Sequence, residues 1–414
     1  MLELIAHLNL EILLTYSVLL ISFAALLLGA AAGAVGSYFF VSRQALLSDA
    51  MAHATLPGLC LAFLLMSALG LDGRWLPGLM LGAALSSWLG VVLVNKMSQQ
   101  PLFDQQSAIA VVLSVFFGFG IVLLTLIQAL PSGARAGLEG YLLGSIIGMR
   151  PLDVLSLALL ALVILLIISL NHRKFTLLTF DRSYAQALGL NFALYQGLLT
   201  FLILAIVVLG LRYVGAILVV AILIIPPASA RLWVTSMTAL VRLSALFGAI
   251  AALFGVLLSA LIAGAPTGAL IVLVNFSLFF FSLLFSRKSG IIRAMREKHS
   301  LAQRVHLRQG LLAMARSEAI YDALTCKILI KRGYMRKDGL ATERGLHTAR
   351  KAVLDEQRLA IARKILVSTE QASALNNLKP IESILTKDTI ALIDQQLRKE
   401  TEQKQAQEQV SIKG

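Results

Sequence analysis

The chain carries little charge for its length. Of its 414 residues only 14% are charged, whereas 58% are hydrophobic. A soluble domain carries about a quarter charged residues, so this composition excludes an ordinary globular protein and indicates a polytopic membrane protein. Cysteine is also scarce. The only two, Cys60 and Cys326, lie far apart in the sequence, which excludes a disulfide framework and a clustered cysteine metal site.

Two familiar sequence signals are missing as well. No G-x-x-x-x-G-K-[ST] phosphate loop occurs in the sequence, so any ATP hydrolysis of that kind belongs to a separate polypeptide and we do not expect an enzyme. No basic region precedes the first apolar run, where Glu3 and Glu11 stand instead. We therefore expect that run to remain as a membrane span and not to be cleaved as a signal peptide.

The charges that do occur are concentrated at the C-terminal end. Residues 1–286 hold 11 of the 36 basic and 8 of the 22 acidic residues, so 25 and 14 lie in 287–414, a net +11. This contrast predicts a polytopic transmembrane domain over 1–286 and a cytosolic basic domain over 287–395. The Gln-, Lys- and Glu-rich segment 396–414 is typical of a disordered tail.

The apolar runs predict an all-α membrane protein with eight or nine transmembrane helices, followed by a mainly helical cytosolic domain. About 20 apolar residues cross a hydrocarbon core of about 30 Å. Little more than Arg212 and Tyr213 separates the sixth run from the seventh. One of these two runs is therefore either a full span or a partial helix, which gives nine spans or eight. The runs lie at 11–36, 46–69, 77–95, 107–130, 151–171, 191–211, 213–233, 240–263 and 267–286.

Nine spans give a consistent orientation. If the tail lies in the cytoplasm, nine basic residues of the loops and span ends fall inside and four fall outside, in agreement with the positive-inside rule. The acidic N-terminus is then outside and the C-terminal domain inside. The inside residues are Arg43, Lys96, Arg173, Lys174, Arg182, Arg231, Arg242, Arg287 and Lys288, and the outside ones are Arg74, Arg135, Arg150 and Arg212.

Asp49 and His53 lie inside the second apolar run, in the segment 43–62. Four residues apart, the two side chains share one face of a helix. A carboxylate at the centre of a bilayer costs roughly 2.5–3.5 kcal/mol on insertion scales, so its presence there is a functional hypothesis by default. His53 is ten residues beyond Arg43, about 15 Å into the membrane, where transporters hold their substrates. The alternative is a pair that simply hydrogen-bonds a neighbouring helix.

Prolines interrupt two of the predicted spans. Pro57, followed by Gly58, has no N–H and displaces the carbonyl of His53, so one helical turn offers a carboxylate, an imidazole and a free carbonyl. The tandem Pro226-Pro227 frees two carbonyls in the same way. Proline and glycine are common in membrane helices, so either a gate on a substrate path or a simple kink is consistent with these positions.

The loop predicted at 172–194 is basic and carries the signals of a short helix. Asp181 or Ser183 can cap its N-terminus, and Gly189 can end it. Such a helix either docks on a partner protein or lies in the lipid headgroups. Its apolar stripe consists of Tyr184, Ala185 and Leu188.

Taken together, residues 10–285 resemble the integral permease subunit of bacterial ABC importers for zinc, manganese or iron. The most specific stretch runs from Leu46 to Gly58 and contains Ser48-Asp49-Ala50, His53-Ala54 and Leu56-Pro57-Gly58. The stretch 258–269 fits only in part, because Ala260 and Gly264-Ala265 replace residues that are common in the family, and we assign no site there. Further matching stretches are Glu139-Gly140-Tyr141-Leu142-Leu143-Gly144-Ser145, Phe180 to Leu190, and Val214 to Arg231.

The resemblance implies a metal site or gate at Asp49 and His53, in the inner membrane of a bacterial cell. It also implies that 180–190 is the coupling helix that seats a separate cytosolic ATPase. An extracytoplasmic metal-binding protein and a second permease subunit, identical or paralogous, are the other implied partners, beside membrane lipid. Imidazole suits zinc and iron, and carboxylate or carbonyl suits manganese. We expect a transported metal and no permanently bound cofactor. The implied supporting residues are Pro57, Gly58, Pro226 and Pro227 for the path, and Asp181, Ala185, Leu188 and Gly189 for coupling.

The tail resembles a second kind of protein at residues 310–366, the winged-helix part of metal-dependent repressors. The matching features are the turn-rich basic strip Arg332–Gly339 and the helix start Thr342–Gly345. Gln357 replaces the histidine of the repressor pattern, which argues against metal binding of that type. Basic charge suits DNA phosphates, and equally an anionic lipid or an acidic protein surface. We favour a docking or regulatory domain over a nucleic-acid-binding one.

Two other functions fit the same features. A membrane-tethered metal-sensing regulator would bind DNA through the tail. A proton-coupled metal carrier would use Asp49 and His53 as a proton relay. Binding of the tail to an operator distinguishes the first from the importer, and transport that collapses with the proton gradient distinguishes the second.

Overall fold

The structure is a computed structural model that describes residues 15–70, 75–129, 151–262, 265–365, 381–383 and 385–413. These residues are helical apart from loops and one β-bridge. The chain divides into two compact units, one up to Arg293 and one from Ala294, close to the boundary predicted after residue 286. The Glu139–Ser145 motif lies outside the described residues.

Within the described part of the first unit, eight helices are long and apolar enough to cross a membrane. Helices of this length and composition are typical of a multi-pass membrane protein. The eight helices are α2 (Tyr16–Val41), α3 (Ala45–Ala68), α4 (Leu76–Met97), α5 (Gln105–Gln128), α8 (Pro151–Phe180), α10 (Phe192–Val214), α12 (Met237–Leu261) and α13 (Thr267–Phe285).

Two shorter helices complete the described part of the first unit. Helix α11 (Ala216–Arg231) has 16 residues, about 24 Å at 1.5 Å per residue, which is less than the thickness of a hydrocarbon core. It follows Gly215, whose positive φ of 87° interrupts the helical conformation between α10 and α11. The run at 213–233 is therefore a short helix rather than a full-length span. Helix α9 (Arg182–Ala187) is the short helix predicted in the basic loop.

The predicted loop boundary at residue 172 is wrong. Helix α8 continues for 30 residues to Phe180 and includes the basic residues Arg173 and Lys174. A helix of this length extends about 45 Å, roughly 15 Å more than the hydrocarbon core. The basic residues end the hydrophobic run but not the helix, because lysine and arginine are good helix formers.

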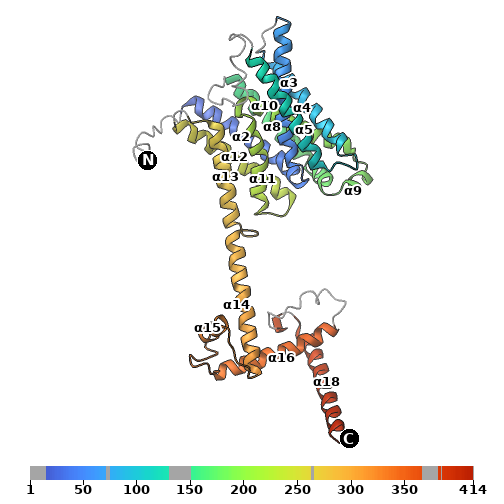
Figure 1. Ribbon diagram of the computed structural model, residues 1–414, viewed down its shortest axis with the longest axis vertical. Coiled ribbons are helices and arrows are strands. Elements are labelled where there is room, and N and C mark those ends of the chain that lie inside the picture. Colours follow the sequence, from blue (N-terminus) through green and yellow to red (C-terminus); the bar gives the residue numbers. More distant parts are fainter. Residues whose placement is uncertain are drawn as a thin grey trace. The chain divides into compact units, whose positions relative to one another are not determined.

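Helix α2 lies at the centre of one group of helices and packs against α8, α11 and α12 (Figure 1). Gly29 and Gly33 are spaced four apart on one face of α2. A Cβ at Gly29 would collide with the carbonyl of Gly248 on α12, and one at Gly33 with that of Ser244. Small residues at this spacing let helix backbones approach closely in membranes, which explains the close packing of α2 on α12.

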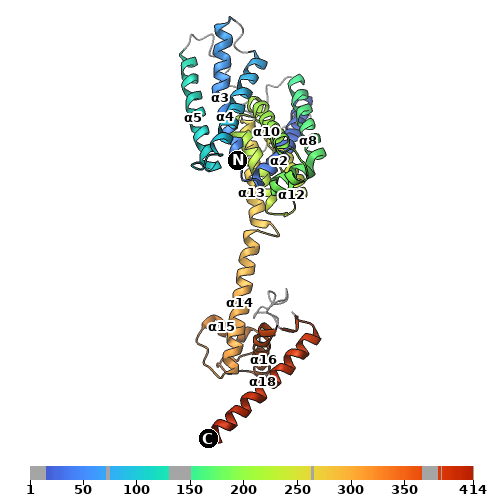
Figure 2. The same cartoon turned by 90° about the vertical axis from the view of Figure 1, so that its right-hand side faces the viewer.

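Helix α3 packs against both α4 and α5 in a second group of helices, and the three run side by side in Figure 2. Leu56, Cys60 and Phe63 of α3 are buried there among Leu79 of α4 and Leu123 of α5. Helices α10 and α11 each contact both α2 and α3. This packing holds the helix that carries Asp49 and His53 on several sides.

The described part of the second unit contains α14 (Ile291–Ala315) from Ala294 onward, α15 (Ala323–Lys331), α16 (Glu343–Ile365), the 3₁₀ turn η2 (Ile381–Ser383) and α18 (Lys387–Lys413). Two small cores stabilise it. One joins α14, α15 and the start of α16 around Leu311, Leu329 and Ala349. The other joins α16, η2 and α18 around Leu359, Ile381 and Ile393.

The winged-helix interpretation of the tail is not confirmed. Only 332–342 separate α15 from α16, and strand pairing in the described residues is limited to one antiparallel bridge between Met335 and Ala341. Gly339, with φ of 86°, turns the chain between them. Helix α15 ends at Lys331 and α16 begins at Glu343, and the residues between them form this single bridge and not a paired β-ribbon.

Helix α18 runs through most of the segment predicted as a tail and ends at Lys413. Glutamine, lysine and glutamate are good helix formers, so a composition that is typical of disorder also permits an extension of a helix that has already begun.

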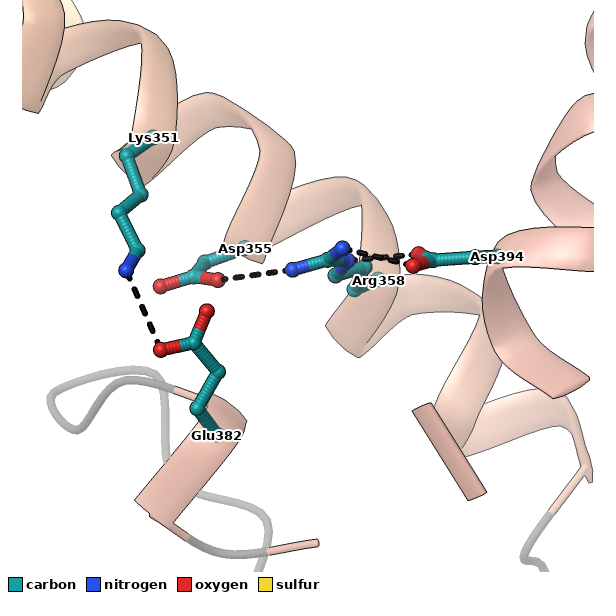
Figure 3. Close-up of polar contacts among 5 residues, drawn as sticks. All are labelled: Lys351, Asp355, Arg358, Glu382 and Asp394. Atoms are coloured by element: carbon teal, nitrogen blue, oxygen red, sulfur yellow. Dashed lines mark hydrogen bonds and ion pairs between the residues drawn. The ribbon is translucent and has the colours of Figure 1, made fainter. Parts of the chain in front are cut away.

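Charged side chains connect α16 to its neighbours in this unit (Figure 3). Arg358 donates two hydrogen bonds of 2.7 Å to the carboxylate of Asp394 on α18. The other side of its guanidinium lies 4.0 Å from Asp355. Lys351 reaches Glu382 of η2 at 3.1 Å. Asp355 is almost fully buried, with one carboxylate oxygen that makes no hydrogen bond.

Candidate functional site

Asp49 and His53 lie one turn apart on α3, as their spacing predicts. The Nε2 atom of His53 is 3.4 Å from the Oδ1 atom of Asp49, and each side chain is 31% exposed. The imidazole also lies edge-on to the ring of Phe117 on α5, with the ring centroids 4.8 Å apart. The pair is therefore half-buried and held on one side by an aromatic ring that the sequence does not single out.

The alternative of a purely structural pair gains no support from these contacts. Within the described residues, the side chains of Asp49 and His53 make their polar contact with each other. The nearby hydroxyl groups are already satisfied, since Ser87 donates to the carbonyl of Met51 and Thr55 to that of Ala52. Asp49 and His53 thus keep free donor and acceptor positions on their exposed side.

Pro57 and Gly58 follow in the same helix and are buried. Pro57 lies inside α3, so the carbonyl of His53 has no i+4 N–H partner. Gly58 meets the backbone of Gly82 on α4. Proline and glycine therefore have distinct effects here, since one frees a carbonyl beside the polar pair and the other permits the close approach of α4.

Pro226 and Pro227 are buried within α11. Pro227 leaves the carbonyl of Leu223 without its usual partner, and this carbonyl lies against Gly36 of α2. Packing of α11 on α2 accounts for this contact. The role of the two prolines as a gate remains a prediction.

The polar pair alone is a small set of metal ligands. Among the described residues no group of three or more His, Cys, Asp or Glu side chains is close enough to hold a metal ion. One imidazole nitrogen, one carboxylate and the carbonyl of His53 fall short of the four ligands of a closed zinc site. The chemistry suits transient contact with a passing cation that keeps part of its water or gains ligands from another chain.

The short helix α9 has the caps that the sequence predicts. The carboxylate of Asp181 accepts the backbone N–H of Tyr184 at 2.9 Å, and Gly189 has a positive φ of 76° just after the helix. The predicted apolar stripe is split, however. Ala185 is fully buried in the core of the first unit, whereas Tyr184 and Leu188 are exposed. The helix is anchored by one residue and presents the other two outward.

A second polar cluster was not predicted. The ring of His172 on α8 hydrogen-bonds the hydroxyl of Tyr38 on α2 at 2.7 Å and that of Thr238 on α12 at 2.9 Å. The histidine opens the basic run 172–174, which we assigned to a loop. Its contacts come from residues far away in the sequence, so local patterns contain no signal for them.

Comparison with known proteins decides the family. Residues 15–286 match the sequence profile of the ABC-3 family, the ABC 3 transport family. The chain belongs to this family. The predicted resemblance is confirmed, and a member of the ABC 3 transport family is a membrane component of a transporter rather than an enzyme. The matched region ends before the C-terminal unit.

Several known proteins are similar to this ABC 3 transport family chain over about two thirds of its length or more. This chain is 39% identical over 293 residues to the manganese transport system membrane protein MntC of Bacillus subtilis. The match covers 70% of this chain and 65% of that protein, so the chain spans less than two thirds of the length of this relative. It is 37% identical over 280 residues to the zinc transport system membrane protein TroC of Treponema pallidum, covering 67% and 92%. The solved structure of PsaBC from Streptococcus pneumoniae in complex with Fab covers 70% of this chain and 99% of its own, with 28% identity and a TM-score of 0.58.

Proposed function

We propose that this chain is the transmembrane permease subunit of an ATP-driven importer of a divalent metal ion. The single observation that carries the proposal is the half-buried Asp49–His53 pair inside a membrane-spanning helix of an ABC 3 transport family member. Charged and ionisable groups at this depth mark ion pathways. The names of the relatives, which specify manganese or zinc, support the same class of cargo.

The metal is manganese or zinc in the first place, with iron as a further candidate. Imidazole is a good ligand for zinc and iron, whereas carboxylate and carbonyl oxygens suit manganese. Asp49, His53 and the carbonyl of His53 offer both kinds of donor. A site with so few protein ligands binds weakly, and weak binding suits a path that must release the ion on the other side.

A second permease subunit, identical or paralogous, completes the path. Each side chain of the pair is 31% exposed on its free side, so a facing copy would add two further side-chain ligands without displacing the first two. Pro57, Gly58, Pro226 and Pro227 support the path by fixing how α3 and α11 pack.

The remaining partners are a cytosolic ABC ATPase and an extracytoplasmic metal-binding protein. The exposed Tyr184 of α9 and Leu188, just after the helix, form the surface that docks on the ATPase, while Asp181, Ala185 and Gly189 hold the helix in place. The protein lies in the bacterial inner membrane with its N-terminus outside and its C-terminal unit in the cytoplasm, an orientation in which the short helix α11 serves as a ninth crossing. That unit is a docking or regulatory domain, and nucleic-acid binding gains no support.

The test is uptake of radioactive manganese and zinc by cells that express the full chain with its ATPase. We expect His53→Ala and Asp49→Asn to reduce uptake to background while the protein level in the membrane is unchanged. The matched control is Asp104→Asn. Asp104 caps α5 outside the span through Ser107, and asparagine preserves that cap. Uptake by either site variant equal to that of wild type would contradict the proposal.

The same cells distinguish ATP-driven import from a proton-coupled carrier. Inactivation of the ATPase subunit should abolish uptake, and collapse of the proton gradient at a constant ATP level should not. The opposite pair of results would favour a proton relay through Asp49 and His53.

A further inference from the structure

A cavity in the first unit lies apart from the Asp49–His53 pair. It has a volume of about 350 Å³ and is partly open. Its walls come from α8 and α12, and Ala34 of α2 lines it as well. The full set of lining residues is Ala34, Leu165, Ile168, Ser169, His172, Thr238, Val241, Arg242 and Ala245.

The lining of this cavity is divided by chemistry. Apolar side chains, among them Leu165, Ile168 and Val241, form one part. The other part is polar, and it includes Thr238 and Arg242, which are one turn apart on α12. A compartment with an apolar part and a cationic part matches a molecule with an acyl chain and an anionic headgroup.

The polar part of the cavity is held in place by hydrogen bonds between helices. The imidazole of His172 is held between Tyr38 on one side and Thr238 on the other, at 2.7 and 2.9 Å. This bridge connects α8, α2 and α12 and fixes one wall of the cavity. No ion-pair partner for Arg242 is found among the described residues, and its side chain is exposed. The guanidinium is therefore free to bind a phosphate, for which its planar fork is well suited.

The position of the cavity along the helices agrees with a headgroup. Arg242 is five residues from the start of α12 at Met237, about 8 Å along the helix. His172 lies eight residues before the end of α8, in the part of this long helix that exceeds the hydrocarbon thickness. Under the orientation proposed above, both lie at the cytoplasmic membrane surface, where basic pockets between helices bind anionic lipid headgroups.

We propose that the cavity between α8 and α12 is a binding site for an anionic phospholipid. Arg242 binds the phosphate, with Thr238 and Ser169 as further hydrogen-bond partners. Leu165, Ile168 and Val241 contact the first part of an acyl chain. The site does not depend on the identity of the transported metal.

The test measures which lipids stay bound to the full-length chain. The protein, with its ATPase and partner subunit where they are needed for stability, is placed in nanodiscs of equal parts phosphatidylglycerol and phosphatidylcholine. It is then released and measured by native mass spectrometry. We expect wild type to retain phosphatidylglycerol, and Arg242→Gln to retain it about tenfold less, since a hydrogen bond to a charged group is lost.

Two further variants make the result specific. Arg173→Gln removes an exposed charge next to His172 that does not line the cavity, and it should retain the lipid as wild type does. Ala245→Leu fills the apolar part and should reduce retention while Arg242 is intact.

Three results would overturn the proposal. The first is equal retention of the two lipids by wild type. The second is equal loss of phosphatidylglycerol in the Arg242 and Arg173 variants, which would indicate a diffuse charge effect. The third is displacement of the lipid by an excess of inorganic phosphate, which would assign the site to a soluble anion.

Discussion

Gly58 on α3 and Gly82 on α4 meet backbone to backbone. A Cβ atom at Gly82 would lie 2.5 Å from the carbonyl oxygen of Gly58, and one at Gly58 would collide with the carbonyl of Gly82. No side chain fits between the two helices at this level. Because Gly58 lies five residues after His53 in the same helix, this contact also determines how the polar pair is held.

Replacement of Gly58 should therefore affect both stability and transport. We expect Gly58→Ala to destabilise the protein by roughly 1–3 kcal/mol, since overpacking forces the helices apart, and to lower metal uptake. The measurement is the midpoint of thermal unfolding in detergent, together with uptake in cells. Gly118→Ala is the matched control, because nothing lies within 4 Å of a Cβ at Gly118 on α5. Equal midpoints for the two variants would show that α3 and α4 have room to move.

The split stripe of α9 separates coupling from folding. Leu188 is exposed and Ala185 is fully buried. We expect Leu188→Glu to abolish metal-stimulated ATP hydrolysis in the reconstituted complex without a change in the unfolding midpoint. Ala185→Leu should instead lower the midpoint, because it overpacks the core.

A control from another loop shows whether the effect is local. Leu102, also exposed, precedes α5, and Leu102→Glu should leave ATP hydrolysis unchanged. Hydrolysis that persists undiminished in the Leu188 variant would contradict the assignment of α9 as the coupling helix.

The C-terminal unit offers two ion pairs between the same helices for comparison. Arg358 and Asp394 form a bidentate, partly buried pair, whereas Lys364 and Glu400 form an exposed one. We expect Arg358→Ala to cost about 2 kcal/mol, as for hydrogen bonds to charged groups, and Lys364→Ala at most about 0.5 kcal/mol. Hydrogen exchange of α18 in the full-length protein measures both. Equal exchange rates in the two variants would mean that burial of the Arg358 guanidinium adds nothing to the stability of this unit.

Asp355 should make the stability of this unit depend on pH. Burial raises the pKa of Asp355, and the positive charge of Arg358 offsets part of this rise. The folded state therefore binds the proton more tightly than the unfolded chain. Stability increases as the pH falls through the raised folded pKa, and the gain is complete below the unfolded value of about 3.9. The other charged groups that act on this carboxylate are Glu382, Lys351 and Arg308.

The variant that checks this is Asp355→Asn, which has no charge to bury. Its α16–α18 region should lack the gain between neutral pH and the unfolded pKa, as measured by hydrogen exchange. Asp322 should affect the pH dependence of stability in the opposite direction. Its hydrogen bond from Thr325 lowers its pKa, so its contribution is lost only as the pH falls through a value below about 3.8. Parallel curves for wild type and Asp355→Asn above that range would contradict the prediction.

The sequence predicted the features that depend on short stretches of chain. The length of an apolar run decides whether a helix can cross a bilayer, so eight of the nine predicted runs coincide with long apolar helices, although α8 extends beyond its run and the run at 213–233 forms only a short helix. The spacing of Asp49 and His53 places them on one helix face whatever surrounds it. The caps Asp181 and Gly189 act within a few residues of α9, and they lie where the pattern predicts.

Tertiary structure decided how these pieces are used. Only packing determines that Ala185 is buried while Leu188 is exposed, that Phe117 lies against His53, and that Gly58 meets Gly82. The cluster at His172 joins residues that are 134 and 66 positions away in the chain. Such contacts depend on how whole helices approach one another, and no local pattern of residues specifies that approach.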